Sequence, residues 1–149
     1  GEVETQRCGH ATLVERLLEV LVIRLLRMSI EMRTVDAGLI AGLAEPRLAK
    51  ALTAMHASPE AQWDLDHLAA IAGMSRSRFA GVFADVMGMP AGEYLRAWRI
   101  GLGKRMLRAG RPVKAVATDV GYGSAMAFSR AFSQVVGTSP RQWLLANVA

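Results

Sequence analysis

Apolar residues recur along most of this chain every three or four positions, the spacing that places them on one face of an α-helix. No run alternates apolar and polar positions with the β-branched enrichment that is typical of strands. The most apolar segment predicts a helix over residues 12–32, with Thr12 as N-cap and Glu15 completing a capping box. Its apolar stripe, which includes Leu17 and Leu21, is broader than one neighbouring helix normally covers. The pattern predicts an all-α protein.

Capping and turn residues divide the rest of the chain into shorter helices. Ser58 and Pro59 mark a boundary, with the serine expected as an N-cap and the proline at the first helical position. Asp64 and Ser75 are expected to cap the next two helices, and Pro90 to open a long one. The predicted helices cover about residues 36–43, 46–57, 64–73, 75–87, 90–109, 113–120 and 124–136, with a last short helix after Pro140.

Part of this pattern is an internal sequence repeat. One set of four residues recurs 49 positions later: Ser75, Phe79, Phe83 and Gly88 as Ser124, Phe128, Phe132 and Gly137. A set just upstream recurs 48 positions later: Leu65, Leu68, Ala69 and Gly73 as Val113, Val116, Ala117 and Gly121. A turn that is one residue longer in the second copy explains the change of offset. Each copy is a short helix, a glycine turn and a second helix, which is typical of helix-turn-helix DNA binding.

The spacing within the repeat separates core from surface. Each phenylalanine pair is four residues apart and lies on one helical face, which predicts a buried position. The opposite faces carry small residues, which let a helix lie deep in a major groove, and arginines, which can contact guanine edges or phosphates. The connecting helix of about 20 residues spans about 30 Å. Because successive groove segments on one face of B-DNA are about 34 Å apart, one chain could occupy two of them.

Charge supports a polyanionic partner. The net charge of the chain is +5. Residues 1–57 carry equal numbers of basic and acidic side chains, so the whole excess lies in residues 58–149, which contain the repeat. Cations near phosphates gain affinity from counterion release. Cys8 is the only cysteine, which excludes a disulfide within the chain and fits a reducing cytoplasm.

The sequence offers little for catalysis or for binding a metal. It holds three histidines, His10, His56 and His67, without a HExxH motif, a paired-cysteine motif or a serine nucleophile elbow. Cys8 and His10 supply two ligands on a tail, too few for a structural zinc site. We therefore expect neither an enzyme nor a cofactor. No leader peptide or membrane-spanning segment is expected.

Two blocks of residues resemble a known family. The first runs from Trp63 through Gly73-Met74-Ser75-Arg76-Ser77-Arg78-Phe79 to Tyr94-Leu95 and Arg99. The second runs from Val116-Ala117 through Gly121-Tyr122 and Phe128-Ser129-Arg130-Ala131-Phe132 to Gly137-Thr138-Ser139-Pro140. Over about residues 58–145 the chain resembles the DNA-binding domain of AraC/XylS-type regulators. The resemblance implies seven helices, two helix-turn-helix motifs (about 64–88 and 113–137) and regulation of bacterial transcription.

The resemblance also implies partners and contact residues. Double-stranded DNA is the expected partner, with RNA polymerase as a further candidate. Residues 13–56 are similar to linker and dimerisation helices that follow a cupin-like sensor, which suggests that an effector-binding sensor was cut away. Residues 12–32 would then join two chains, or pack within one. The DNA-binding residues implied are Arg76, Ser77, Arg78, Ala80, Gly81, Arg99, Ser124, Ala125, Met126, Ser129 and Arg130.

Two interpretations therefore remain open from the sequence. The first has residues 1–57 as a helical linker or dimerisation segment and residues 58–149 as a DNA-binding domain in the cytoplasm. The alternative is a helical module for protein-protein interaction that does not read DNA. Arg99 is the cation most strongly expected to have a fixed partner.

Overall fold

The computed structural model describes residues 17–24 and 36–147, and every element within these ranges is a helix. Residues 17–24 are helical and belong to a separate unit, whereas the chain from Ala37 onward forms one compact unit. The all-α prediction is confirmed for the described residues. The labelled helices are α2 (Asp36–Ala44), α3 (Pro46–Ala57), α4 (Leu65–Ala72), α5 (Arg76–Met87), α6 (Ala91–Arg108), α7 (Val113–Asp119), α8 (Ala125–Val136) and α9 (Pro140–Asn147).

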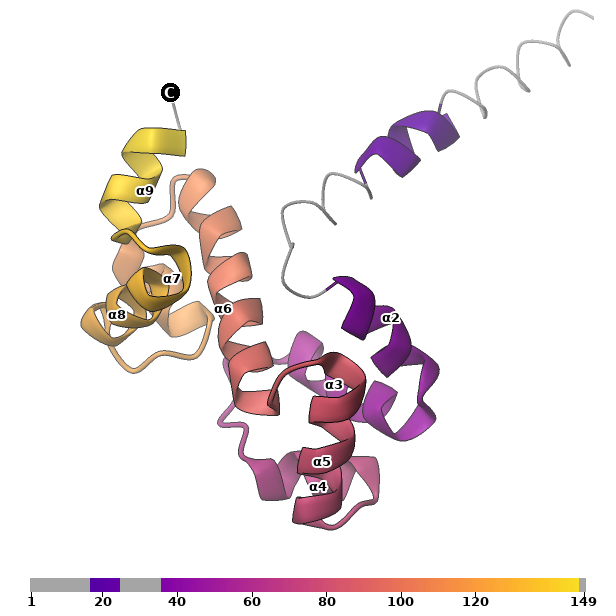
Figure 1. Cartoon of the computed structure of the whole chain (residues 1–149). Coiled ribbons are helices and arrows are strands. Elements are labelled where there is room, and N and C mark those ends of the chain that lie inside the picture. The colour runs from indigo at the N-terminus through magenta and orange to yellow at the C-terminus, as the bar shows by residue number, and fades with distance from the viewer. Residues whose placement is uncertain (1–16, 25–35, 148–149) are drawn as a thin grey trace, which may run out of the picture. The chain divides into compact units, whose positions relative to one another are not determined.

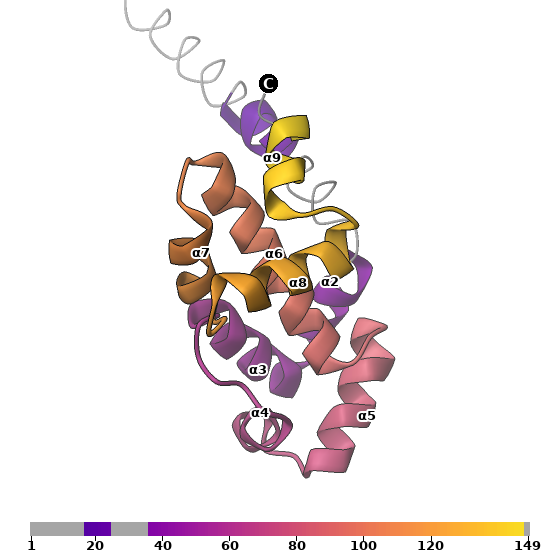
Figure 2. The ribbon, with the colours of Figure 1, turned by 90° about the vertical axis from the view of Figure 1, so that its left-hand side faces the viewer.

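The longest of the described helices, α6, connects two small helical groups (Figure 1). Helices α3, α4 and α5 lie toward one end of α6, and α7, α8 and α9 lie toward its other end, as the second view also shows (Figure 2). At 18 residues, α6 is about 27 Å long, close to the length expected for the connector. The prediction of two helix-turn-helix units on one connecting helix is therefore confirmed.

The first group is built on aromatic and aliphatic side chains from four helices. Phe79 and Phe83 of α5 are fully buried, and the ring of Phe83 meets Tyr94 of α6 edge-on at 5.7 Å. Leu48 and Leu52 of α3 are also fully buried, so α3 contributes as much core as α4 or α5. Residues 58–147 contain six helices, α4 to α9, one fewer than the seven that the family resemblance implies for about this range.

The second group has its own core around the phenylalanine pair of α8. Phe128 and Phe132 are fully buried, and Trp143 of α9 closes the cluster with its ring edge-on to Phe132 at 5.7 Å. The backbone of Gly103 approaches this core so closely that a Cβ atom there would lie 2.8 Å from the ring of Phe128. Gly101 has open space around it. Gly101 and Gly103 both lie in the interior of α6, but only Gly103 therefore permits close packing.

One expected element is wrong. Ser58 and Pro59 do not begin a helix, because Ser58 is the C-cap of α3 and residues 59–64 form a loop. Long side chains hold this loop: the indole of Trp63 donates to the carbonyl of Ser58 at 2.7 Å. The next helix, α4, begins instead after Asp64, which is its N-cap.

The predicted helix over residues 12–32 is described only at 17–24, and Thr12 and Glu15 lie outside the described residues. All eight residues of 17–24 are exposed, with Leu17 61% exposed and Leu21 53%. Within the described ranges, no helix combines the length and the apolarity needed to cross a bilayer.

Candidate nucleic-acid interface

Both helix-turn-helix units are built from the same stop and start signals. A left-handed glycine closes the first helix of each unit: Gly73, with φ of 66°, is the C-cap of α4, and Gly121, with φ of 90°, follows the C-cap of α7. The following amides, of Met74 and Tyr122, donate back to Ala69 and Ala117 at 2.9 and 2.8 Å, which satisfies carbonyls at the helix end. One residue then precedes the next N-cap in the first unit and two in the second.

The second helix of each unit starts on a serine. The hydroxyl of Ser75 accepts from the amide of Arg78 at 3.3 Å, and that of Ser124 accepts from the amide of Ala127 at 3.1 Å. Each helix ends on another left-handed glycine, Gly88 or Gly137. These caps fix which face of α5 and of α8 is buried, because the phenylalanines follow the serine at the same interval in both.

On α5, the residues opposite the phenylalanines form a small, partly basic surface. Ser77, Arg78 and Gly81 are exposed, and Ala80 is half-buried. A Cβ atom added to Gly81 would meet no atom within 4 Å, so this position faces open space. A surface of this kind leaves room for a close approach by another molecule.

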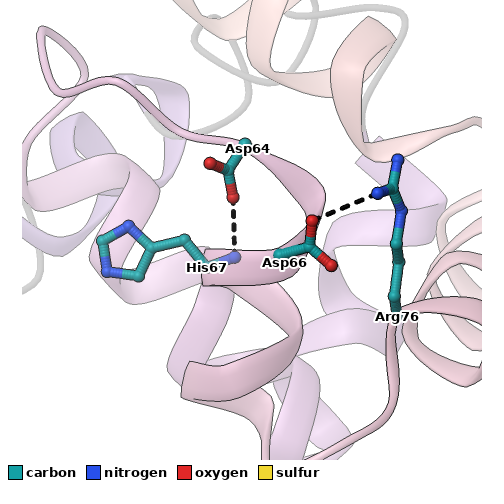
Figure 3. A network of polar contacts seen from close by, with 4 residues as sticks. All are labelled: Asp64, Asp66, His67 and Arg76. Atoms are coloured by element: carbon teal, nitrogen blue, oxygen red, sulfur yellow. Dashed lines mark hydrogen bonds and ion pairs between the residues drawn. The ribbon is translucent and has the colours of Figure 1, made fainter.

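Arg76, the first residue of α5, has an acidic partner on α4. Its guanidinium is 3.1 Å from a carboxylate oxygen of Asp66, and both side chains are about two-thirds exposed. Figure 3 shows this pair next to Asp64, whose carboxylate caps α4 by accepting from the amide of His67 at 2.7 Å. Exposed ion pairs of this type contribute little, typically about 0.2–1 kcal/mol, so a phosphate group could displace Asp66. The sequence reasoning did not identify Asp66.

On α8, the corresponding surface mixes an exposed methionine with an arginine. Ser124 and Met126 are exposed, and Ala125 and Ser129 are half-buried. The exposed guanidinium of Arg130 lies 3.1 Å from the sulfur of Met126, one helical turn earlier. This surface can offer both charged hydrogen-bond donors and apolar contact. None of the acidic side chains of the described residues is on α8.

Arg99 belongs to neither α5 nor α8. It is half-buried on α6, where its Nε donates to the carbonyl of Pro59 at 2.7 Å and its Nη2 to the carbonyl of Ala61 at 2.8 Å. Burial lowers the pKa of Arg99, while Tyr122 and Glu60 oppose that shift by favouring the charged form. The fixed partner expected for Arg99 is therefore present, and it is backbone rather than another charge.

The described residues contain no group of three or more histidine, cysteine or acidic side chains that could hold a metal ion. His56 is half-buried and already has contacts: its ring stacks on Trp98 at 3.9 Å, and its Nε2 lies 2.5 Å from the hydroxyl of Tyr94. Cys8 and His10 lie outside the described residues.

Comparison with known proteins identifies the same region. The family described as "Helix-turn-helix domain" matches residues 68–146, more than half of the chain. A protein of Streptomyces antibioticus described as an AraC-like transcription regulator is 42% identical over 142 residues, which cover 93% of this chain and 46% of that protein. The regulator AlkR of Acinetobacter baylyi is 33% identical over 144 residues, which cover 95% of this chain and 47% of that protein.

A solved structure of the DNA-binding domain of the transcriptional factor AdpA, in complex with a target DNA, superimposes with a TM-score of 0.62 at 28% identity. The alignment covers 66% of this chain and 89% of that one. The chain spans about half the length of the curated relatives it matches.

Proposed function

Because the chain belongs to the AraC-type helix-turn-helix family, we propose that it binds double-stranded DNA sequence-specifically as part of a bacterial transcription regulator. Helices α5 and α8 then enter successive major-groove segments. The observation that carries this proposal is the pair of identically capped helices, each with its phenylalanines buried and its opposite side exposed. The family is one of regulators, and we infer no catalytic activity for this chain.

Helix α8 supplies the more informative contacts in this proposal. Arg130 can donate in bidentate fashion to O6 and N7 of guanine, the commonest specific contact in the major groove. Met126, which is 65% exposed, offers apolar contact to a thymine methyl group. Ala125 and Ser129 are small enough to let the helix lie deep in the groove, and Ser124 lies at the positive end of the helix, where backbone amides favour a phosphate.

Helix α5 reads DNA mainly through close approach. Ala80 and Gly81 have no polar side-chain group for a base edge, so Ser77 is the one uncharged donor on this surface. Arg76 and Arg78 then contact phosphates, with Arg76 exchanging Asp66 for the DNA backbone. We leave Arg99 out of the proposed contact set, because its guanidinium is already committed to two carbonyl groups.

The proposal for the whole protein extends further. We propose a cytoplasmic regulator that works as a homodimer through residues 12–32, contacts RNA polymerase and receives its effector on a separate sensor domain. The exposed apolar residues of 17–24 support the dimer. Replacing Leu17 and Leu21 together by aspartate in the whole chain should convert a dimer to a monomer in sedimentation; a wild-type monomer would contradict this part.

Selection of bound duplexes from random DNA tests the main proposal. The chain should enrich a site with two contacted segments, and its affinity should fall by about 0.9 log units per log unit of salt for each phosphate neutralised. Failure to enrich any sequence, or binding that does not depend on salt, would favour the alternative of a protein-interaction module.

Arg130 provides a sharper test of the reading helix. Arg130→Ala should weaken binding to the selected site by about five- to 150-fold, the equivalent of 1–3 kcal/mol, and weaken random DNA much less. Arg141→Ala, which removes an exposed arginine from α9, is the matched control. An equal loss on both kinds of DNA would reduce Arg130 to a phosphate contact.

A further inference from the structure

One side chain contacts both halves of the compact unit. From α6, Arg99 donates to the carbonyls of Pro59 and Ala61, which belong to the loop between α3 and α4. That loop leads directly into the first helix-turn-helix unit, because Asp64 caps α4. Two carbonyl groups held by one planar guanidinium fix the loop in position and in orientation, since the donors of arginine form a rigid fork.

The same guanidinium also lies against the turn of the second unit. A Cβ atom added to Gly121 would be 2.8 Å from Nη2 of Arg99 and 2.9 Å from Cα of Glu60, so turn, guanidinium and loop are in close contact. The Cζ atom of Arg99 lies 5.8 Å from the ring centre of Tyr122. With φ of 90° and this crowding, residue 121 has two reasons to be glycine.

Tyr122 in turn contacts α8, the second helix of the second unit. Its ring meets Phe128 of α8 edge-on, with ring centres 5.7 Å apart. Phe128 is fully buried and follows the capping Ser124 by one helical turn. A continuous set of contacts therefore runs from the loop that precedes α4, through Arg99 and Tyr122, to the start of α8.

We propose that Arg99 is a positioning residue that sets the separation and orientation of the two helix-turn-helix units. The contacts of Arg99, and not the length of α6 alone, then determine which distance between two DNA segments the protein can bind. This inference rests on the proposed function, since spacing matters only if both units bind DNA. It assigns Arg99 a role between the units in place of a contact with phosphate or base.

The substitution Arg99→Lys separates this role from charge. A lysine keeps the positive charge, but its single ammonium group cannot reproduce the fork that reaches both carbonyls. Arg99→Gln is the second variant, neutral and still able to donate. Arg96→Lys and Arg96→Gln are matched controls, because Arg96 is exposed on the same helix one turn earlier. Thermal melting of all four variants shows which of them are folded at the assay temperature.

The first measurement uses the duplex selected by the wild-type chain, and versions with one base pair added or removed between the two contacted segments. Wild-type protein and both Arg96 variants should bind the original spacing best. The Arg99 variants should bind the original duplex about tenfold more weakly, because they lose the charge-assisted contacts within the protein that hold the two units at this spacing. They should bind the three spacings nearly equally.

The second measurement needs no DNA. Spin labels at Asp85→Cys on α5 and Gln134→Cys on α8, both exposed, report the distance between the units in a Cys8→Ser background. Arg99→Lys and Arg99→Gln should give a broader distance distribution than the wild type or the Arg96 controls. Both labelled positions lie outside the proposed contact set.

The two measurements separate the possible failures. A broader distribution in a chain that binds no DNA would leave Arg99 as the positioning residue and remove the proposed function. An unchanged distribution with an unchanged preference for spacing would overturn the inference. It would also be overturned if the Arg99 variants weakened all three spacings equally and the neutral one reduced the salt dependence by about one phosphate, because Arg99 would then contact DNA.

Discussion

Two glycines on α6 allow a direct test of the packing between α6 and α8. Gly101 and Gly103 are two residues apart on the same helix, and each costs about 1 kcal/mol relative to alanine by helix propensity alone. Gly101 has no neighbouring atom within 4 Å of an added Cβ, whereas Gly103 faces two ring atoms of Phe128 at 2.8 Å. The two substitutions to alanine therefore have the same benefit and differ only in the contact.

The contact at Gly103 cannot relax easily. Phe128 is fully buried, with Tyr122 and Phe132 each packed at 5.7 Å between ring centres, so its ring has little room to move. Overpacking of this kind costs about 1–3 kcal/mol. We expect Gly101→Ala to stabilise the chain by about 1 kcal/mol. Gly103→Ala should instead be neutral or destabilising by up to about 2 kcal/mol, because overpacking offsets the helix gain.

Urea denaturation followed by circular dichroism at equilibrium measures both variants against the wild type. The midpoint should rise for Gly101→Ala and stay or fall for Gly103→Ala, with the slope unchanged in each case. An equal gain in both variants would show that α8 does not lie against Gly103, and would refute the packing described for the second core.

Three further predictions concern the surface and the first core. Asp66→Asn should strengthen binding to random duplex DNA about two- to fivefold by releasing Arg76 from a weak surface pair, and unchanged anisotropy titrations would contradict this. Gly81→Ala should stabilise the chain by about 0.5–1 kcal/mol, since its Cβ meets nothing, and yet weaken binding to the selected site; a gain in both would move Gly81 off the interface. Burial lowers the pKa of His56, so the neutral ring contributes stability that is present above the ordinary value of about 6.5 and lost as the pH falls below it. His56→Gln should remove that part of the pH dependence of unfolding, and an identical profile in the variant would contradict the assignment.

The features predicted correctly from sequence are those set by neighbouring residues. Ser75 and Ser124 cap their helices through hydroxyl contacts three residues away, and the phenylalanine pairs are buried by their helical spacing alone. Gly73 and Gly121 end their helices at the expected places. Such features depend on residues only a few positions apart, so they can be predicted from the sequence without knowledge of the fold.

The features missed from sequence depend on residues far apart in the chain. Ser58 and Pro59 have the local pattern of a helix start, but Arg99, 40 residues beyond Pro59, holds this segment as a loop. The burial of Leu48 and Leu52 likewise depends on how α3 packs against α4, so the place of α3 in the core was not evident. Gly101 and Gly103 look alike in sequence and differ only because Phe128 faces one of them.

The second turn holds one residue more than the first, and yet both units keep the same hydrogen bonds at the end of one helix and the same serine cap at the start of the next. Each segment from capping serine to closing glycine therefore contains its own start, its own core residues and its own stop. A change of length in the turn is absorbed where it occurs and does not shift the buried face of the helix that follows. Such a segment is a natural unit of exchange, in evolution or by design, by which new surface residues can enter the domain while its core stays the same.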